Sequence, residues 1–374
     1  MKRLLLVVAL LAISTPVWAQ FGGLDGALKK VQEAQDAKKK YFDDLNVTEE
    51  EELKIGADVS LKLRQRFGVV QDQAIHKYVT LLGTLLAQQT ERPKLPWTFV
   101  VLDTDGVNAF AAPGGIVHIT RGALGLIKNE AELAAVLAHE AGHVAHKHTV
   151  NAIRKNKAVQ LGTNETLSDR GAFLDRIANK AYEMTLENSF DRGDELDADA
   201  VSVALTQTLG FAPASLADFL ARLDERNKDQ PARNGLFASH PETKERIEKV
   251  QKAGASKAGL TGEARYKMNV HYEATPITQI AAVADGSAGL TGTTAPKDDK
   301  KGDDQKADDQ KKKGFGLGAL KQTVAPQQQS AQVTASGGSR GLGADRAAKG
   351  GSNPSVVKVS VSNDDVAAFK KGIA

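Results

Sequence analysis

The sequence predicts an α+β fold in which a small β-sheet packs beside a mostly helical body. Two short runs rich in β-branched residues, Thr98–Leu102 and Ile116–Thr120, have the composition of strands and lie on either side of a turn-rich stretch that ends at Gly115. Segments with helical periodicity precede and follow them. One of these segments, Glu130–His148, is apolar on nearly every side, which is typical of a helix at the centre of a fold.

The central segment also carries helix signals of its own. Asn129 precedes it as a candidate N-cap, and Glu132 follows three residues later, as in a capping box. Gly142 is an unfavourable helix residue, by about 1 kcal/mol relative to alanine, so we expect another group to pack closely against it. The remaining predicted helices are Glu50–Arg66, Asp72–Gln89, Gly122–Lys128, Gly171–Glu187, Glu195–Thr208, Ser215–Asp224 and His240–Lys252.

Composition divides the chain into segments. Residues 49–253 have the mixed composition of one globular domain with a substantial core. A polar, lysine-rich arm at 20–48 precedes this domain, and an extension of uncertain structure at 254–285 follows it. Residues 286–354 combine clusters of Asp and Lys with stretches rich in Gln, Ser and Gly, which predicts a disordered low-complexity linker. Alternating valines and a helix-cap signal predict a small C-terminal element at 355–374.

Residues 1–19 have the pattern of a secretory signal peptide. Lys2 and Arg3 precede an unbroken apolar run from Leu4 to Ile13, and the small residue Ala19 marks a cleavage site. This run is too short for a transmembrane helix, which needs about 20 residues; an uncleaved anchor is the alternative interpretation. The chain has no cysteine, which for an exported protein favours a bacterial periplasm over an animal extracellular setting.

The overall charge is close to balanced. The chain has 49 basic and 46 acidic residues, and the signal peptide holds two of the basic ones, which leaves 47 against 46 and a net charge of +1. This balance gives no reason to expect nucleic-acid binding. A second long apolar stretch is missing from the sequence, so we expect no transmembrane segment in the mature chain.

The central helix contains a candidate metal motif, His139-Glu140-Ala141-Gly142-His143. Because His139 and His143 are four residues apart, they lie on one face, one turn apart, where both imidazoles can reach one metal ion. Glu140 is about 100° further round the helix, close enough to take a proton from water without being a ligand. This is the His-Glu-x-x-His arrangement of zinc sites with glutamate as general base. Two hydrogen-bonded core histidines are the structural alternative.

A catalytic zinc ion needs a third protein ligand. In one class of such enzymes it is a histidine six residues beyond the motif, but that position is Thr149. We expect His146 and His148 at a basic, surface-facing helix end. Glu195 and Asp199 are better candidates, Glu195 as the ligand and Asp199 as the acceptor of a ligand histidine's second ring N–H. The alternative is a solvated acidic helix start.

Four motifs, in the same order, resemble a known family. They are the His-Glu-x-x-His helix, the later Glu-x-x-x-Asp helix, the stretch Asn108-Ala109-Phe110-Ala111, and Ser239-His240-Pro241 followed by Arg246. Over about residues 50–247, the chain is similar to the gluzincin-type zinc metallopeptidases that include HtpX, BepA, LoiP, the mitochondrial Oma-type protease and the CAAX prenyl protease. It is most similar to the compact periplasmic members without transmembrane helices.

The resemblance implies a zincin-type metallopeptidase domain over 49–253, with the sheet packed beside the active-site helix, and one Zn²⁺ ion per chain. It implies that His139, His143 and Glu195 are the zinc ligands. Glu140 would be the catalytic base, and the carboxylate of Asp199 would hold a ligand histidine.

Further site residues are implied in the same way. Arg192 stands where the family has an arginine near the active-site cleft. His240 stands where the family has a histidine that approaches the metal, either stabilising the oxyanion or blocking the water position in a resting form. The segment Gly115–Thr120 would be the edge strand to which an extended substrate adds. The implied substrate-binding residues are Asn108, Ala109, Phe110, Gly115, Ile116, Val117 and His118.

Together these features predict a periplasmic zinc metalloendopeptidase. We expect it to hydrolyse unfolded or misassembled envelope proteins, with polypeptide substrates and with envelope or outer-membrane partners. The main alternative is a chaperone or assembly factor in which proteolysis is latent. A prenyl-protein processing enzyme is a second alternative, which the lack of transmembrane segments to hold a lipidated substrate disfavours.

Overall fold

The computed structural model describes residues 46–160, 170–187, 190–228, 240, 243–254, 258–277, 280–282, 334–336 and 353–373. The predicted signal peptide, most of the polar arm and most of the predicted linker lie outside these residues, as do Ser239 and Pro241. The predictions made for them therefore stay predictions. Within the described ranges, no helix combines the length and the apolar character needed to cross a membrane.

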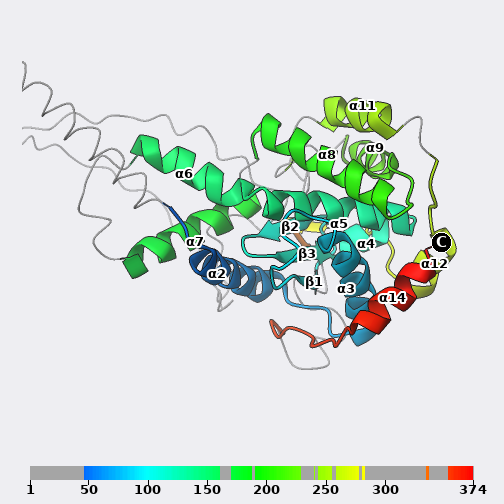
Figure 1. Cartoon of the computed structure of the whole chain (residues 1–374), viewed down its shortest axis with the longest axis horizontal. Helices are drawn as coiled ribbons and strands as arrows, with labels where there is room; N and C mark the ends of the chain where they lie inside the picture. Colours follow the sequence, from blue (N-terminus) through cyan, green and yellow to red (C-terminus); the bar gives the residue numbers. More distant parts are fainter. Residues whose placement is uncertain are drawn as a thin grey trace, which may run out of the picture.

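A three-stranded sheet lies at the centre of the described part of the chain (Figure 1). Strand β1 (Thr98–Leu102) runs parallel to β3 (Ile116–Thr120), and β2 (Ala109–Ala112) pairs antiparallel with β3 on its other side. His118 therefore has Val100 of β1 and Phe110 of β2 as its two cross-strand partners.

The expectation that Gly115–Thr120 forms an edge strand is wrong, because β3 has a paired neighbour on each side. The edge strand beside the helix that carries His139 and His143 is β2. The sequence pattern missed β2 because all four of its residues are buried, so they lack the alternation that marks a half-buried strand. A turn at Gly114 and Gly115, with φ of 76° and 99°, returns the chain into β3.

Helices cover both faces of the sheet, and alternate residues of each strand face different cores. On β1, Phe99 and Val101 lie in a first core, and Val100 and Leu102 lie in a second. The first core is formed with α3 (Gln73–Ala87), α4 (Arg121–Leu126), α5 (Glu130–Ala145), α8 (Arg192–Thr208), α9 (Ser215–Asn227), α11 (Thr243–Gly254) and α12 (Glu263–Asn269), and the second with α2 (Glu49–Phe67), α6 (His148–Gln160) and α7 (Arg170–Glu187).

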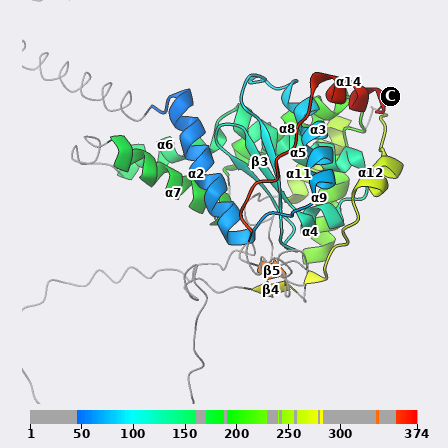
Figure 2. The same cartoon turned by 90° about the horizontal axis from the view of Figure 1, so that it is seen from below.

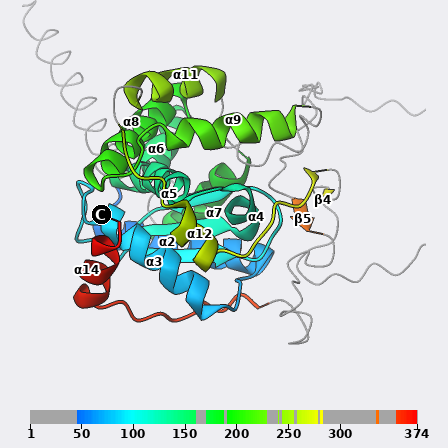
Figure 3. The same cartoon turned by 90° about the vertical axis from the view of Figure 1, so that its right-hand side faces the viewer.

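Helix α8 lies along α5, as Figures 1 and 3 show. A Cβ atom at Gly142 would lie 3.2 Å from the Cα of Ala198 and 3.1 Å from the Cβ of Val201. The close approach expected at Gly142 is thus confirmed. It matters for the site because it brings the first turns of α8 beside the face of α5 that carries the two histidines.

The predicted helix Glu130–His148 is two helices. α5 ends at Ala145, His146 is its C-cap, and α6 begins at His148. Lys147, between them, has a φ of 57°, in the left-handed region that residues other than glycine seldom adopt. This break redirects the chain just beyond the metal motif. The helix predicted from His240 also differs, since α11 begins at Thr243.

The C-terminal residues 353–373 pack on the domain. Figure 2 shows them (red) crossing from the end of α2 to α14 (Asn363–Lys371). There Lys77 of α3 pairs with Asp365 at 3.0 Å, and Val366 is buried in the first core. The described core therefore includes a segment that follows the metal motif by more than two hundred residues.

The predicted fold class is confirmed. The described residues form a mostly helical body with a small mixed sheet beside α5. A separate antiparallel pairing joins β4 (Ile280–Ala282) to β5 (Thr334–Ser336).

Candidate metal centre

Three histidines and one glutamate converge beside the sheet. α5 presents His139 and His143, α8 presents Glu195, and His240 comes from the chain before α11. The Nε2 atoms of His139 and His143 are 3.1 Å apart, and His240 Nδ1 is 3.3 Å from His139 Nε2. Glu195 Oε1 lies 3.5 Å from His143 Nε2 and 2.8 Å from His240 Nδ1. Each of the four residues is at most 4% exposed.

This geometry fits a zinc ion. Four ligand atoms at about 2.1 Å from zinc, at the corners of a tetrahedron, lie about 3.4 Å from one another. The nitrogen–nitrogen separations of 3.1 and 3.3 Å agree with that value, as does the 3.6 Å between His139 Nε2 and Glu195 Oε2. Imidazole nitrogen and carboxylate oxygen are also the donors that zinc takes in catalytic sites. The chain's own residues therefore offer four donor groups close enough to surround one ion, with His240 in the place of the fourth corner.

Asp199 and Arg246 contact two residues of this cluster, His139 and Glu195. His139 Nδ1 is 3.0 Å from Asp199 Oδ1, so the carboxylate lies beside the second ring nitrogen of this histidine. Arg246 donates to both oxygens of Asp199, at 2.8 and 2.7 Å, and its NH1 atom is 2.7 Å from Glu195 Oε2. Burial raises the pKa of Asp199, but the hydrogen bonds from Arg246 and His139 outweigh it and hold that pKa well below its ordinary value.

The electrostatic environment favours the protonation states that bind a metal. Burial lowers the pKa of His143 well below its ordinary value, so this imidazole is neutral. Burial raises the pKa of Glu195, but the charges of His240 and Arg246 outweigh this effect and the net pKa is lowered. A neutral imidazole and an ionised carboxylate are the forms that coordinate zinc.

Glu140 is a buried carboxyl whose oxygens make no hydrogen bond among the described residues. It is 1% exposed. His240 Nε2 lies 3.6 Å from its Oε1 atom. Burial raises the pKa of Glu140, in part against the attraction of His240 and His139. Because an unpaired buried carboxylate is costly, these oxygens are suited to receive a water molecule or substrate.

Arg192 lies apart from this cluster in its described contacts. Its side chain is 58% exposed, and its Nε donates to Glu245 Oε2 at 2.7 Å. The guanidinium that contacts the cluster is that of Arg246, which the sequence pattern placed in a motif without giving it a role. The role expected for Arg192 stays a prediction.

The residues predicted to bind substrate divide between two strands. Asn108 directly precedes the edge strand β2, and Ala109 and Phe110 lie in it. Ile116–His118 lie in β3, whose backbone already pairs on both sides. The His118 side chain is fully buried, and its Nε2 is 2.9 Å from Ser60 Oγ of α2.

His146 and His148 form a second cluster, with Asp197. The expectation that both face solvent is wrong for His148, which is 6% exposed. The break at Lys147 turns it inward, where its Nδ1 is 2.9 Å from His143 Nδ1. His148 Nε2 is 3.2 Å from Asp197 Oδ2, and His146, which is partly exposed, hydrogen-bonds to the same carboxylate.

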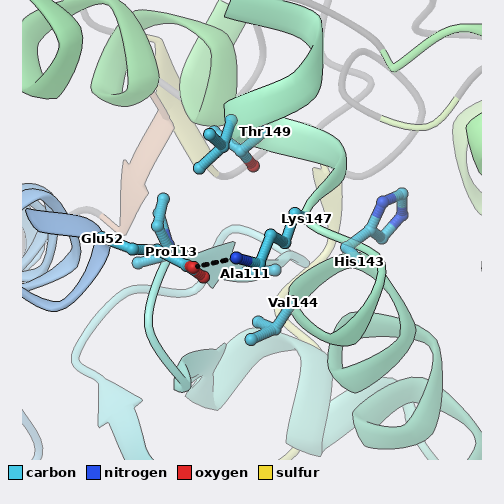
Figure 4. A pocket seen from close by; sticks show the side chains of 9 residues that line it. Glu52, Ala111, Pro113, His143, Val144, Lys147 and Thr149 are labelled. Atoms are coloured by element: carbon cyan, nitrogen blue, oxygen red, sulfur yellow. Dashed lines mark ion pairs between the residues drawn. The ribbon is translucent and has the colours of Figure 1, made fainter. Parts of the chain in front are cut away.

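A pocket lies beside His143, between the end of α5 and the turn after β2 (Figure 4). Glu52 and Lys147 form an ion pair in it, at 3.2 Å. Glu52 also accepts hydrogen bonds from the Gly114 backbone N–H at 3.1 Å and from Arg92 at 2.7 Å. This buried carboxylate therefore ties α2 to the β2–β3 turn and to the end of the active-site helix. The pocket is lined by Glu52, Ala111, Ala112, Pro113, His143, Val144, Lys147, Thr149 and Val150.

The fold and the cluster define a class of protein, the metallopeptidases whose site is built on a His-Glu-x-x-His helix. Within this class, residues 74–253 match the model of peptidase family M48. Residues 74–253 thus form an M48-type metallopeptidase domain, and for this part of the chain the family predicted from the four motifs is confirmed. All the residues of the metal cluster lie within the matched range.

Relatives of known name agree with this family. The chain is 27% identical to the beta-barrel assembly-enhancing protease of Yersinia pestis over 203 residues. This aligned region covers 51% of this chain and 41% of that protein. It is 26% identical over 222 residues to the mitochondrial metalloendopeptidase OMA1 of Arabidopsis thaliana, an alignment that covers 58% of this chain and 44% of that protein. It is 28% identical over 166 residues to the metalloprotease LoiP of Escherichia coli, an alignment that covers 42% of this chain and 62% of that protein. The chain spans about half the length of the curated relatives it matches.

Proposed function

We propose that this protein is a zinc-dependent metalloendopeptidase that cleaves unfolded or misassembled envelope proteins. The observation that carries the proposal is the buried cluster of His139, His143, Glu195 and His240 beside Glu140, whose oxygens make no hydrogen bond among the described residues. In this proposal the first three are zinc ligands. Zinc supplies a Lewis acid that polarises the scissile carbonyl and makes water easier to deprotonate.

Glu140 is the general base of the proposed reaction. Its carboxylate oxygen takes the proton of the attacking water and passes it to the leaving amine. The raised pKa that burial gives Glu140 suits this task, because a base with a pKa nearer to the working pH can both accept and return a proton. The ring of His240, with Nε2 3.6 Å from Glu140, is placed to donate to the oxyanion once it moves off the fourth corner.

The edge strand β2 is the proposed substrate platform. In this proposal an extended peptide adds to the edge of β2 that does not pair with β3, by backbone hydrogen bonds, which bind any sequence that is unfolded. The side chains of Ala109, Phe110 and Ala111 are small or buried in the cores, so the strand itself imposes little side-chain selection. This supports a preference for unfolded chains over a defined sequence.

The relatives and the sequence together support an envelope location. One relative is named as a beta-barrel assembly-enhancing protease, and residues 1–19 have the pattern of a signal peptide. We therefore propose a periplasmic protein with misassembled envelope proteins as clients and with outer-membrane partners.

A second candidate function is a chaperone or assembly factor with latent proteolysis. The observation that favours it is the position of His240, whose Nδ1 stands at the fourth corner of the site, where water would otherwise lie. Such a protein would bind clients at β2 while cleavage stays blocked.

Cleavage of casein by the purified protein tests the proposal. We expect cleavage with about one zinc ion bound per chain, and its loss both in Glu140→Gln and after chelation. Bound zinc without cleavage, followed by cleavage in His240→Ala, would favour the latent form. Failure to bind zinc would contradict both candidates. Equal rates on a stably folded protein and on its unfolded form would contradict the proposed substrate class.

A further inference from the structure

The ring of His148 connects His143 to a carboxylate at the surface. His148 Nδ1 is 2.9 Å from His143 Nδ1, and its Nε2 is 3.2 Å from Asp197 and 3.8 Å from Asp194. On the other side, the ring of Phe190 stacks on that of His143, with 4.0 Å between centroids. Away from its Nε2 atom, His143 therefore contacts the polar ring of His148 and the apolar ring of Phe190, and its Nδ1 points to a single described partner.

The positions of the ring protons follow from which nitrogen of His143 faces the metal. His143 faces His139 and Glu195 through Nε2, so a metal there needs the lone pair of Nε2 and leaves the ring proton on Nδ1. That N–H points at His148 Nδ1, which must then accept the hydrogen bond. A neutral His148 that accepts at Nδ1 carries its own proton on Nε2, where it donates to Asp197.

We propose that His148, backed by Asp197, is a positioning residue of the metal centre. It accepts the Nδ1 proton of His143 and so holds the tautomer and the ring orientation that present His143 Nε2 to zinc. The inference rests on the proposed function, because it takes zinc to bind at His143. It gives His143 the kind of support that Asp199 gives His139. Outer partners of this kind change metal affinity by about 10–100-fold.

The same residues could be taken for a second metal site, since one ligand atom from each of His146, His148 and Asp197 lies within 4.8 Å of the others. The proton arrangement opposes this use. A metal on His148 Nε2 would need the lone pair there, which moves the proton to Nδ1 and sets two N–H groups against each other at 2.9 Å. A loaded zinc centre and a metal on His148 are therefore incompatible, and we expect one zinc ion per chain.

Two substitutions of His148 separate positioning from packing. Phenylalanine keeps the shape of a ring but has no acceptor, whereas asparagine is smaller but places an oxygen near the position of Nδ1. If His148 acts through its hydrogen bond, His148→Phe should bind zinc about 10–100-fold more weakly than the wild type, and His148→Asn should recover most of that loss. If His148 only fills space, His148→Phe should bind zinc more tightly than His148→Asn.

His146→Ala is the matched control, because the described hydrogen bonds and ion pairs of the His146 ring are with Asp197 and Glu91. Its zinc affinity should stay within about twofold of the wild type. The affinities are measured on the purified full chain by competition with a chromophoric chelator, and the bound zinc is counted by native mass spectrometry. Ring ¹⁵N NMR of the zinc-loaded protein should show His148 as the Nε2–H tautomer and His143 as the Nδ1–H tautomer.

Three outcomes would overturn the proposal. They are wild-type zinc affinity in His148→Phe, an Nδ1–H tautomer at His148, and two zinc ions per chain that fall to one in His146→Ala. A wild-type protein that bound no zinc would overturn the proposed function together with this inference. A wild type that binds zinc and cleaves casein, beside a His148→Phe variant of equal affinity, would overturn only the positioning role.

Discussion

Arg246 is a cation shared by two buried carboxylates, and Arg246→Met tests how much the site depends on it. The residue is 2% exposed, donates to both oxygens of Asp199 at 2.7 and 2.8 Å, and contacts Glu195 at 2.7 Å. Methionine fills much of the same volume, so the change removes mainly the charge and the donors. Removing one partner of a buried ion pair costs about 3–5 kcal/mol, which is the loss in unfolding free energy we expect at pH 7 for the metal-free protein.

The way in which the stability difference between Arg246→Met and the wild type changes with pH identifies the cause of the loss. In the wild type, Arg246 lowers the pKa of Asp199, which therefore contributes stability that is lost only as the pH falls through that low value. Without Arg246, burial raises the pKa of Asp199, and protonation in mild acid relieves the unpaired charge. The stability difference between variant and wild type should therefore shrink as the pH falls from 7 to 5.

Urea unfolding in the presence of a chelator measures these differences. In the double variant Arg246→Met/Asp199→Leu, one of the two uncompensated carboxylates is gone, so its stability loss should be smaller than the sum of the two single losses. A stability loss that is constant with pH, together with additive single losses, would refute the electrostatic reasoning and leave packing as the role of Arg246.

Three further predictions follow from the fold. Burial lowers the pKa of His118 to about 3. Between pH 6.5 and 3 the unfolded chain therefore binds a proton that the folded protein excludes, which lowers the free energy of unfolding by up to about 1.4 kcal/mol per pH unit. In urea unfolding, the free energy of unfolding should fall less steeply from pH 7 to 5 in His118→Gln than in the wild type. Gly142→Val should lower the unfolding free energy by about 1–3 kcal/mol and Gly142→Ala by less, because a Cβ there already lies 3.1 Å from Val201, and equal losses would contradict this. Deletion of residues 353–374 uncovers the surface of α3 that Val366 covers and should lower the Tm by at least about 5 °C; an unchanged Tm would show that this segment adds no stability.

The spacing of residues along the sequence was sufficient to predict much of the candidate site. The four-residue interval between His139 and His143 places both rings on one face of a helix whatever the rest of the fold does, and their Nε2 atoms are 3.1 Å apart. The same rule predicted that Glu195 and Asp199 share a face of α8, and both contact His139. The strands β1 and β3 were also recognised from their β-branched residues, with the bounds that the structure has.

Other features depended on contacts between distant segments. The order of strands places β3 in the middle and β2 at the edge, and no local pattern in either strand encodes that order. The buried cation of the site is Arg246 rather than Arg192, since both are ordinary arginines at helix starts until the packing of α11 on α8 buries one of them. His148 turns inward because the chain leaves the helix at Lys147.

The sequence by itself therefore determined the fold class, the helix of the His-Glu-x-x-His motif and the second helix that brings Glu195 beside it. These follow from periodicity, which acts over a few residues and is readable in one segment at a time. The tertiary structure alone decided which strand is the edge, which arginine is buried, where His148 points and that residues 353–373 return to α3. Each of these depends on contacts between segments far apart in the chain, whose partners are chosen by the packing of the whole core.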